Sequence, residues 1–199
     1  MSGTPSDFEA RYQQDATPWD LDHPQPAVVR LLDAGVVAGS VLDLGCGTGE
    51  NALLIAARGH PVMGLDAAPT AIERARQKAA ARGFAPPGVQ FHVWDALQLG
   101  RLRKSFETVI DCGLFHVFDR PTRRQYVQSV AEVAGSGADL IVLCFSDEEP
   151  PGPGPHRITD SDLREAVRGI FAVMDLEATT FERRDEPPAQ AWLARFTKI

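Results

Sequence analysis

The sequence is poor in the residues that mark several classes of protein. It holds only three cysteines among 199 residues, an odd number that predicts reduced thiols and not a disulfide framework. Its apolar runs, such as 138–145, are far shorter than the roughly 20 residues that span a bilayer. The N-terminus has early acids and no apolar core of the kind a secretory signal needs. We therefore expect a cytoplasmic protein with no membrane partner.

Basic residues are also scarce relative to acidic ones. Lys and Arg number 20 against 27 Asp and Glu, which gives a formal net charge of −7. Such a charge repels a phosphate backbone, so we expect no nucleic-acid partner. Cys46, Cys112 and His116 fall short of a complete ligand set, so we expect no metal. The size predicts one domain, and we expect a monomer or weak homodimer.

Helical and strand patterns alternate along most of the chain, which predicts a doubly wound α/β fold with a mostly parallel sheet and helices on both faces. No helical pattern separates the last two strands, so they are expected to pair as an antiparallel hairpin. The predicted helices are 26–35, 50–59, 70–83, 121–134 and 159–170, and the predicted strands are 40–45, 61–66, 88–95, 106–111, 138–145, 171–182 and 190–198.

A glycine-rich turn follows the first strand in the stretch VLDLGCGTGE. Gly45, Gly47 and Gly49 allow a sharp turn and a close approach of the backbone to a ligand, which in open α/β sheets lies beyond the carboxyl ends of the strands. The dinucleotide pattern G-x-G-x-x-G is not met, because Glu50 stands where its last glycine would be. Together with Asp43, Glu50 favours a cofactor that has a cationic part and no phosphate, such as S-adenosylmethionine.

Acidic residues also end the next two strands. Asp66 stands about 20 residues further on, where a carboxylate can accept hydrogen bonds from ribose hydroxyls. Asp95 ends the third strand, where it can accept from the adenine amino group while Trp94 packs against the ring. A single aspartate at a strand end usually caps a helix or turn. Three in succession beside a glycine turn predict a cofactor site.

These motifs resemble those of a known family. VLDLGCGTGE, GLDAAP and VWDA are similar to the three cofactor-binding motifs of the class I, Rossmann-like S-adenosylmethionine-dependent methyltransferases, and the resemblance extends from about residue 26 to the end of the chain. It implies that the glycine turn lies along the methionine part, that Asp66 binds the ribose and that Asp95 lies at the adenine. The predicted cofactor contacts are Asp43, Gly45, Cys46, Gly47, Gly49, Asp66, Ala67, Trp94, Asp95, Ala96 and Asp111.

Three further segments, PWDLDHPQP, DCGLFHVF and LCFSD through PGPGPHR, resemble the small-molecule branch that includes thiopurine, halide and heterocycle methyltransferases. That branch uses its N-terminal arm as a cover, which implies a lid in residues 1–25 and a methyltransferase domain in 26–199. The expected reaction transfers a methyl group from S-adenosylmethionine to an N, O or S atom of a small aromatic or heterocyclic molecule and leaves S-adenosylhomocysteine.

The strand 106–111 is expected to end beside the glycine turn. Asp111 or nearby carbonyls would then accept from the methionine ammonium, and His116 would lie near the methyl donor. His116 would serve as a base or as an orienter, since positioning and desolvation alone can support an in-line displacement. The predicted substrate contacts are Phe8, Tyr12, Trp19, Phe115, His116, Phe145, His156 and Arg157. For each of these, packing in the core or in a loop is the alternative interpretation.

Three other functions stay open at the level of sequence. They are a methyltransferase acting on a protein or RNA, a non-catalytic protein that binds S-adenosylmethionine, and a nicotinamide-dependent oxidoreductase. The net acidity disfavours RNA, and Glu50 disfavours a nicotinamide cofactor. The residues do not identify the methyl acceptor.

Overall fold

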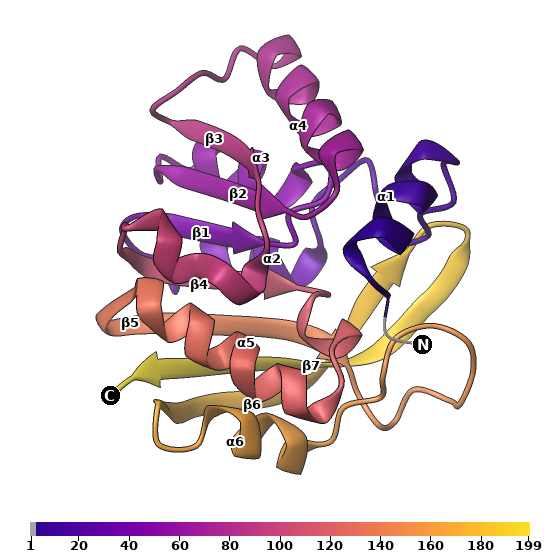
Figure 1. The fold of residues 1–199 in the computed structure, drawn as a ribbon, viewed down its shortest axis with the longest axis vertical. Helices are drawn as coiled ribbons and strands as arrows, with labels where there is room; N and C mark the ends of the chain where they lie inside the picture. Colours follow the sequence, from indigo (N-terminus) through magenta and orange to yellow (C-terminus); the bar gives the residue numbers. More distant parts are fainter. Residues whose placement is uncertain (1–2) are drawn as a thin grey trace.

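One seven-stranded sheet organises the chain in the computed structural model, which describes residues 3–199 (Figure 1). The strand order is β3-β2-β1-β4-β5-β7-β6, with parallel pairing from β3 to β5 and antiparallel pairing through β7 and β6. The predicted doubly wound sheet and its terminal hairpin are thereby confirmed. The strands are β1 Val41–Leu44, β2 Val62–Asp66, β3 Val89–Val93, β4 Phe106–Cys112, β5 Ala134–Phe145, β6 Phe171–Arg183 and β7 Glu186–Lys198.

Helices cover both faces of this sheet. One apolar core lies between the sheet and α2, α3 and α4, and another lies between the sheet and η1, α5 and α6. Proline begins α2 and α4, as its fixed φ and missing N–H favour at a first helical position. The helices are α1 Pro5–Gln13, α2 Pro26–Asp33, α3 Glu50–Ala57, α4 Pro69–Ala81, α5 Arg120–Val133 and α6 Asp160–Val167, with short 3₁₀ helices η1 Ala96–Leu102 and η2 Phe115–Val117.

The arm, of which the first two residues lie outside the described range, contains a helix that the sequence analysis did not predict. In α1, Thr4 and Asp7 form a reciprocal capping box. The Glu9 carboxylate accepts from the N–H and hydroxyl of Thr70 in α4, at 3.0 and 2.6 Å. At the other end of the arm, the Arg184 N–H donates to the Pro18 carbonyl at 2.7 Å. The arm therefore joins α4 to the β6–β7 hairpin across the carboxyl ends of the parallel strands, as Figure 1 shows.

The strand β5 begins earlier than predicted. Ala134 already pairs with Phe106, and a register shift follows before Asp139 pairs with Thr108. The pattern 134–137 contains two glycines and no apolar alternation, so it gave no strand signal. In the described part of the chain, no helix is long and apolar enough to cross a bilayer.

Candidate active site

A cavity of about 420 Å³ lies at the carboxyl ends of the central strands, with the arm among its walls. Its lining comes from the glycine turn, the ends of β2, β3 and β4, the arm, and the tip of the β6–β7 hairpin. Here β1 lies between β2 and β4. The chain runs outward from β1 through β2 to β3 and then returns to β4 on the other side of β1, so the strand order reverses at this point and opens a crevice. The topology thus creates the site where the sequence motifs meet.

The glycine turn forms one wall. Gly45, Gly47 and Gly49 all have positive φ, at 65, 53 and 89°. A Cβ atom on Gly47 would lie 2.8 Å from the Tyr12 hydroxyl. The turn therefore needs glycine both for its backbone conformation and for the close approach of the arm.

Asp66 links the glycine turn to the end of β2. Its Oδ2 accepts from the Gly47 N–H and its Oδ1 from the Ala68 N–H, both at 2.9 Å. Burial raises the pKa of this carboxyl, while the backbone bonds oppose the rise. Each oxygen carries two lone pairs, so each retains one for a further donor. A pair of vicinal hydroxyls on a ribose fits this carboxylate.

The next strand end supplies Trp94, Asp95 and Ala96, and all three line the cavity, as does Ala67 at the end of β2. Asp95 also caps η1, because its Oδ1 accepts from the Leu97 N–H at 2.9 Å. Asp95 therefore both caps a helix and lines the cavity.

Glu50 corrects one step of the sequence argument. It lines the cavity, but its oxygens accept from Lys78 at 2.9 Å and from Arg82 at 2.7 and 2.8 Å. Burial opposes ionisation, yet the bonds to Arg82 and Lys78 hold the pKa of Glu50 below its usual value. The expectation that Glu50 offers its charge to a cofactor is wrong, because two cations on α4 and at its end already neutralise it.

Asp43 and Asp111 lie behind the cavity wall and do not line it. Asp111 is fully buried and accepts from three donors: the N–H groups of Leu114 and Phe115, at 2.8 and 3.1 Å, and the Tyr126 hydroxyl at 2.7 Å. Its side chain thus shapes the turn that leads to His116. We expected either the Asp111 side chain or nearby backbone carbonyls to accept a hydrogen bond from the methionine ammonium. The Asp111 carboxylate already accepts from three groups of the protein, so the backbone carbonyls at the end of β4 are the acceptors that remain.

His116 lines the cavity from η2 with only 4% of its surface exposed. Its Nδ1 accepts from the Phe145 N–H at 2.9 Å, and its ring stands edge-on to the Phe145 ring at 4.8 Å between centroids. Burial lowers the pKa of His116 to about 3, the Gly113 backbone, which Nε2 faces, opposes this, and Arg123 and Arg157 add to it. The imidazole is therefore neutral at pH 7, and because Nδ1 accepts, the proton is on Nε2.

The predicted substrate contacts divide into two groups. Phe8, Tyr12, Trp19, His116 and Phe145 line the cavity, with the Trp19 indole N–H donating to the Tyr12 hydroxyl at 3.0 Å. The other three, Phe115, His156 and Arg157, do not line it.

Packing explains why these three lie elsewhere. Phe115 is buried against Tyr126, with ring centroids 6.4 Å apart. Arg157 donates to the carbonyls of Pro150 and Pro155 and so closes the loop after β5. His156 donates its N–H to the His116 carbonyl at 2.9 Å. Packing in the core or in a loop, the alternative interpretation given above, therefore describes these three residues.

Other residues that line the cavity were not predicted from the sequence. Phe181, at the end of β6, lies 5.5 Å from the Phe145 ring and 6.0 Å from the His116 ring. Arg183 and Glu186, at the hairpin tip, pair at 3.0 Å and also line the cavity. The alternation in 171–182 placed Phe181 in a strand, but no sequence pattern showed that the tip of the hairpin returns to the glycine turn.

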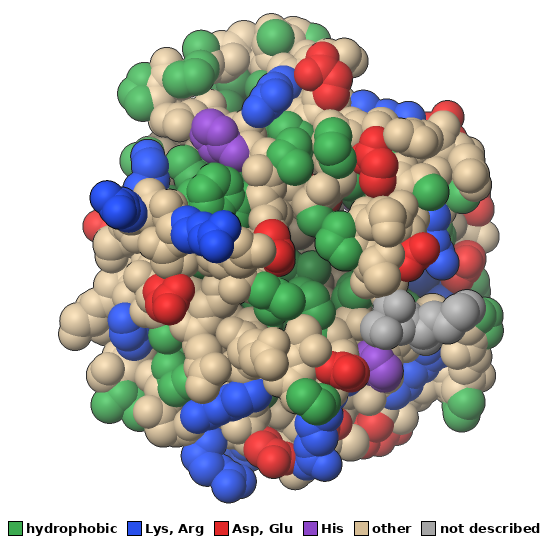
Figure 2. Space-filling view, viewed as in Figure 1, with side chains coloured by type: hydrophobic (Ala, Val, Ile, Leu, Met, Phe, Trp, Pro, Cys, Tyr) green, Lys and Arg blue, Asp and Glu red, His purple; other side chains and the backbone are tan. Residues whose placement is uncertain are grey.

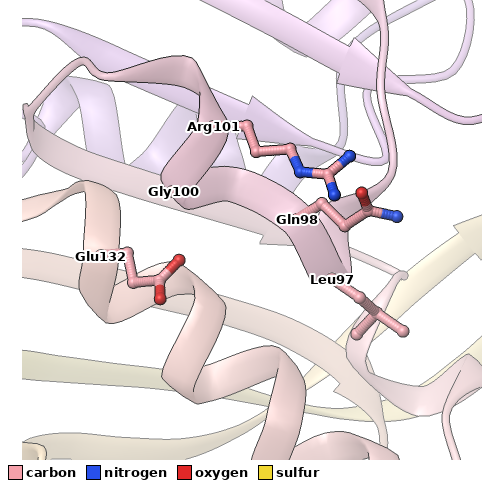
Figure 3. A pocket seen from close by; sticks show the side chains of 5 residues that line it. All are labelled: Leu97, Gln98, Gly100, Arg101 and Glu132. Carbon is pink, nitrogen blue, oxygen red and sulfur yellow. The ribbon is translucent and has the colours of Figure 1, made fainter.

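A second depression lies between η1 and α5, where Gln98 and Arg101 project from η1 and Glu132 from α5 (Figure 3). Leu97 and Gly100 complete its lining, and none of the five lines the main cavity. It contains none of the motif residues, so we place the chemistry in the main cavity. No group of three or more His, Cys, Asp or Glu residues within 3–199 is arranged to hold a metal ion.

Fold and site together define a doubly wound domain with a cavity at its glycine turn. Consistently, the sequence model of a methyltransferase domain matches residues 41–137. The chain is 40% identical over 178 residues to 2-heptyl-1-hydroxyquinolin-4(1H)-one methyltransferase of Mycobacteroides abscessus, covering 85% of this chain and 78% of that protein. It is 28% identical over 194 residues to probable thiol methyltransferase 2 of Arabidopsis thaliana, covering 93% and 83%.

Solved structures agree. One, from work on the conversion of a disulfide bond into a thioacetal group during echinomycin biosynthesis, superposes with a TM-score of 0.89 at 35% identity, over 98% of this chain and 93% of that one. The 1,6-didemethyltoxoflavin-N1-methyltransferase of Burkholderia thailandensis shares the fold, with a TM-score of 0.74 at 21% identity over 98% and 86%. The chain belongs to the S-adenosylmethionine-dependent methyltransferases.

Proposed function

We propose that this methyltransferase acts on a small aromatic or heterocyclic acceptor whose hydroxyl, thiol or ring N–H ionises without help from a protein base. The observation that carries the proposal is the state of His116. Its Nδ1 lone pair is used by the Phe145 N–H, and its Nε2 carries a proton. His116 therefore does not offer a base, and its Nε2–H, which also faces the Gly113 backbone, is the donor that it can share with an anionic acceptor. Cys112, which also lines the cavity, has a pKa raised by burial and supplies no thiolate.

Aromatic lining supports a flat acceptor. Phe118, Phe145 and Phe181 line the same cavity as His116, and Trp19 lines it from the arm. Such side chains bind rings through apolar contact and edge-to-face packing. The named activities of two relatives point the same way, since a hydroxyl on a ring nitrogen and a thiol both ionise more readily than an alcohol.

The geometry of the cavity supports a set of cofactor contacts. We propose that the backbone from Gly45 to Gly47 lies along the methionine part, that Asp66 accepts from the ribose hydroxyls, and that Asp95 lies at the adenine beside Trp94. When bound, S-adenosylmethionine supplies an electrophilic methyl carbon on a sulfonium. The protein orients the acceptor toward that carbon, excludes water with its aromatic lining and donates from His116.

The arm is proposed to act as a lid. Phe8, Tyr12 and Trp19 line the cavity, and the Thr48 hydroxyl of the glycine turn donates to Asp20 at 2.5 Å. Opening the arm would expose the cavity to water. Removal of residues 1–20 should therefore weaken cofactor binding and slow methyl transfer to small acceptors.

We further propose that the chain works in the cytoplasm as a monomer or weak homodimer and does not bind nucleic acid. Three free thiols suit a reducing compartment. Acidic and basic side chains are interspersed over the face seen in Figure 2, so this face offers no basic patch to a phosphate backbone.

The test of the acceptor class is a set of phenols, thiols and hydroxylated heterocycles that differ in acidity, assayed for methyl transfer across a range of pH. We expect the rate with each acceptor to rise with pH up to the pKa of that acceptor. A rate that instead follows one ionisation, the same for every acceptor, would identify a protein base and overturn the proposal.

A further inference from the structure

Three carboxyl groups meet at the end of the sheet. Asp43 is on β1, with Asp66 on β2 and Asp111 on β4, the two strands that flank it. In the register, Asp43 lies opposite Gly64 and Ile110, one residue before the level of Asp111. Burial raises the pKa of all three. Three negative charges at such a spacing repel one another, so the cluster favours retaining a proton.

The three acids are unequally hydrogen-bonded. Asp111 accepts from three donors and Asp66 from two backbone N–H groups. Asp43 is 1% exposed, and neither of its oxygens has a hydrogen-bond partner. Ionising a buried carboxyl that no donor solvates is strongly unfavourable. The proton of the cluster therefore belongs on Asp43, whose pKa is raised to about 8 by burial and then by Asp111 and Asp66.

The groups that face Asp43 offer no positive charge. Around it lie Asp111 and Cys112 from β4, Asp66 from β2, Cys46 from the glycine turn, Tyr126 from α5 and the Ala52 N–H from the first turn of α3. That N–H lowers the pKa of Asp43 slightly but does not reach hydrogen-bond geometry with its oxygens. Lys78 and Arg82, which reach the glycine turn, are bonded to Glu50.

S-adenosylmethionine carries an ammonium, a sulfonium and one carboxylate, so it adds a net positive charge to the glycine turn directly in front of Asp43. We propose that Asp43 holds a proton in the free protein and releases it to solvent when S-adenosylmethionine binds, so that cofactor binding and the loss of one proton are coupled. This inference rests on the placement of the cofactor proposed above. No other bond is made or broken in the step.

The sign of the pH dependence follows from this coupling. A group whose pKa falls on binding makes the ligand bind more tightly as pH rises toward the pKa of the free protein, here about 8. Between pH 6 and pH 8 we expect the dissociation constant to fall up to about tenfold per pH unit. The ammonium of the cofactor also titrates at alkaline pH, so the effect must be measured against a variant that lacks only the Asp43 carboxyl.

The experiment is calorimetric titration of the full chain with S-adenosylmethionine at pH 7, in two buffers that differ in ionisation heat. The wild type should release close to one proton. Asp43→Asn keeps the shape of the protonated acid and should release none beyond the cofactor's own, with an affinity equal to the wild type at pH 6 and weaker at pH 8. Asp95→Asn, the same substitution at the adenine end, should weaken binding and leave proton release unchanged.

Equal proton release by the wild type and Asp43→Asn would overturn the inference and leave the proposed function standing. Absence of binding to the wild type would instead overturn the cofactor placement, and the inference with it. If Asp43→Asn does not fold, infrared difference spectroscopy of the wild type decides the question. Cofactor addition should remove the C=O band of a buried carboxylic acid, and an unchanged band would overturn the inference.

Discussion

His116 permits a test in which two substitutions separate its two nitrogens. In His116→Asn, the amide oxygen takes the place of Nδ1 and can still accept from the Phe145 N–H, but no donor remains at the position of Nε2. In His116→Gln, the longer amide returns a donor near the position of Nε2 and abandons the Phe145 N–H. The first variant removes the proposed contribution to the reaction, and the second removes the structural one.

The two substitutions should affect different quantities, the first kcat/KM and the second thermal stability. A hydrogen bond to a charged group contributes about 1.5–3 kcal/mol, so His116→Asn should lower kcat/KM by about 10- to 150-fold while leaving stability nearly unchanged. An unsatisfied buried N–H costs about 1–3 kcal/mol, so His116→Gln should lose roughly 2–4 °C of Tm for each kcal/mol and retain more activity than His116→Asn. Methyl transfer to one phenol and one thiol, with thermal unfolding of each variant, measures both effects.

If His116 acted as a base, both variants would lose activity toward the phenol and spare the thiol. That pattern would refute the reasoning. Equal losses for the two acceptors in His116→Asn, with little loss in His116→Gln, are the outcome that the donor role requires.

The remaining predictions concern the cofactor and the arm. Asp66→Asn should raise the Kd of S-adenosylmethionine by about 10- to 150-fold, measured by calorimetry, because the ribose hydroxyls lose a hydrogen bond to a charged carboxylate. Gly47→Ala forces φ of 53° on a residue with a Cβ, at about 1–2 kcal/mol, and pushes that atom against the Tyr12 hydroxyl, so the arm should be cleaved faster in limited proteolysis. Bonds to Asp22 and Glu182 raise the pKa of His23, so its anchoring of the arm is full at acidic pH and is lost as pH rises through that raised pKa. Protection of the arm amides from hydrogen exchange, taken relative to the intrinsic exchange rate at each pH, should therefore fall as pH rises through that raised pKa, and His23→Gln should remove this fall.

Local patterns were sufficient to predict that the glycine turn and the strand-end residues Asp66 and Asp95 line one cavity. Each of these patterns lies within a single βαβ unit: the strand periods, the glycine spacing and the acids at strand ends. The place of a residue in such a unit therefore predicts its place at the edge of the sheet. Gly47 and Asp66 illustrate this, since they lie 19 residues apart and meet through a hydrogen bond at 2.9 Å.

Long-range partners could not be predicted in the same way. Glu50 is neutralised by Arg82, 32 residues away, and Asp111 is bonded to Tyr126 on a helix 15 residues away. Neither pairing leaves a periodic trace in the sequence. Phe181 reaches the cavity only through the register of an antiparallel hairpin, which side-chain alternation does not determine. The helix α1 was not predicted, because its sequence is polar and shows no apolar helical period after the capping box that begins it.

The hairpin tip has a consequence for how this scaffold can diversify. Arg183 pairs with Glu186, which leaves Arg184 and Asp185 as a two-residue turn, with Asp185 at φ 58°. Lengthening such a turn adds little closure entropy. It would reshape the part of the cavity wall that we propose for the acceptor, while the glycine turn follows β1, which lies three strands from β7 in the sheet. The tip is thus the place where we would insert residues to alter which acceptors enter, with the Arg184 N–H kept in reach of the Pro18 carbonyl so that the arm stays joined to the hairpin.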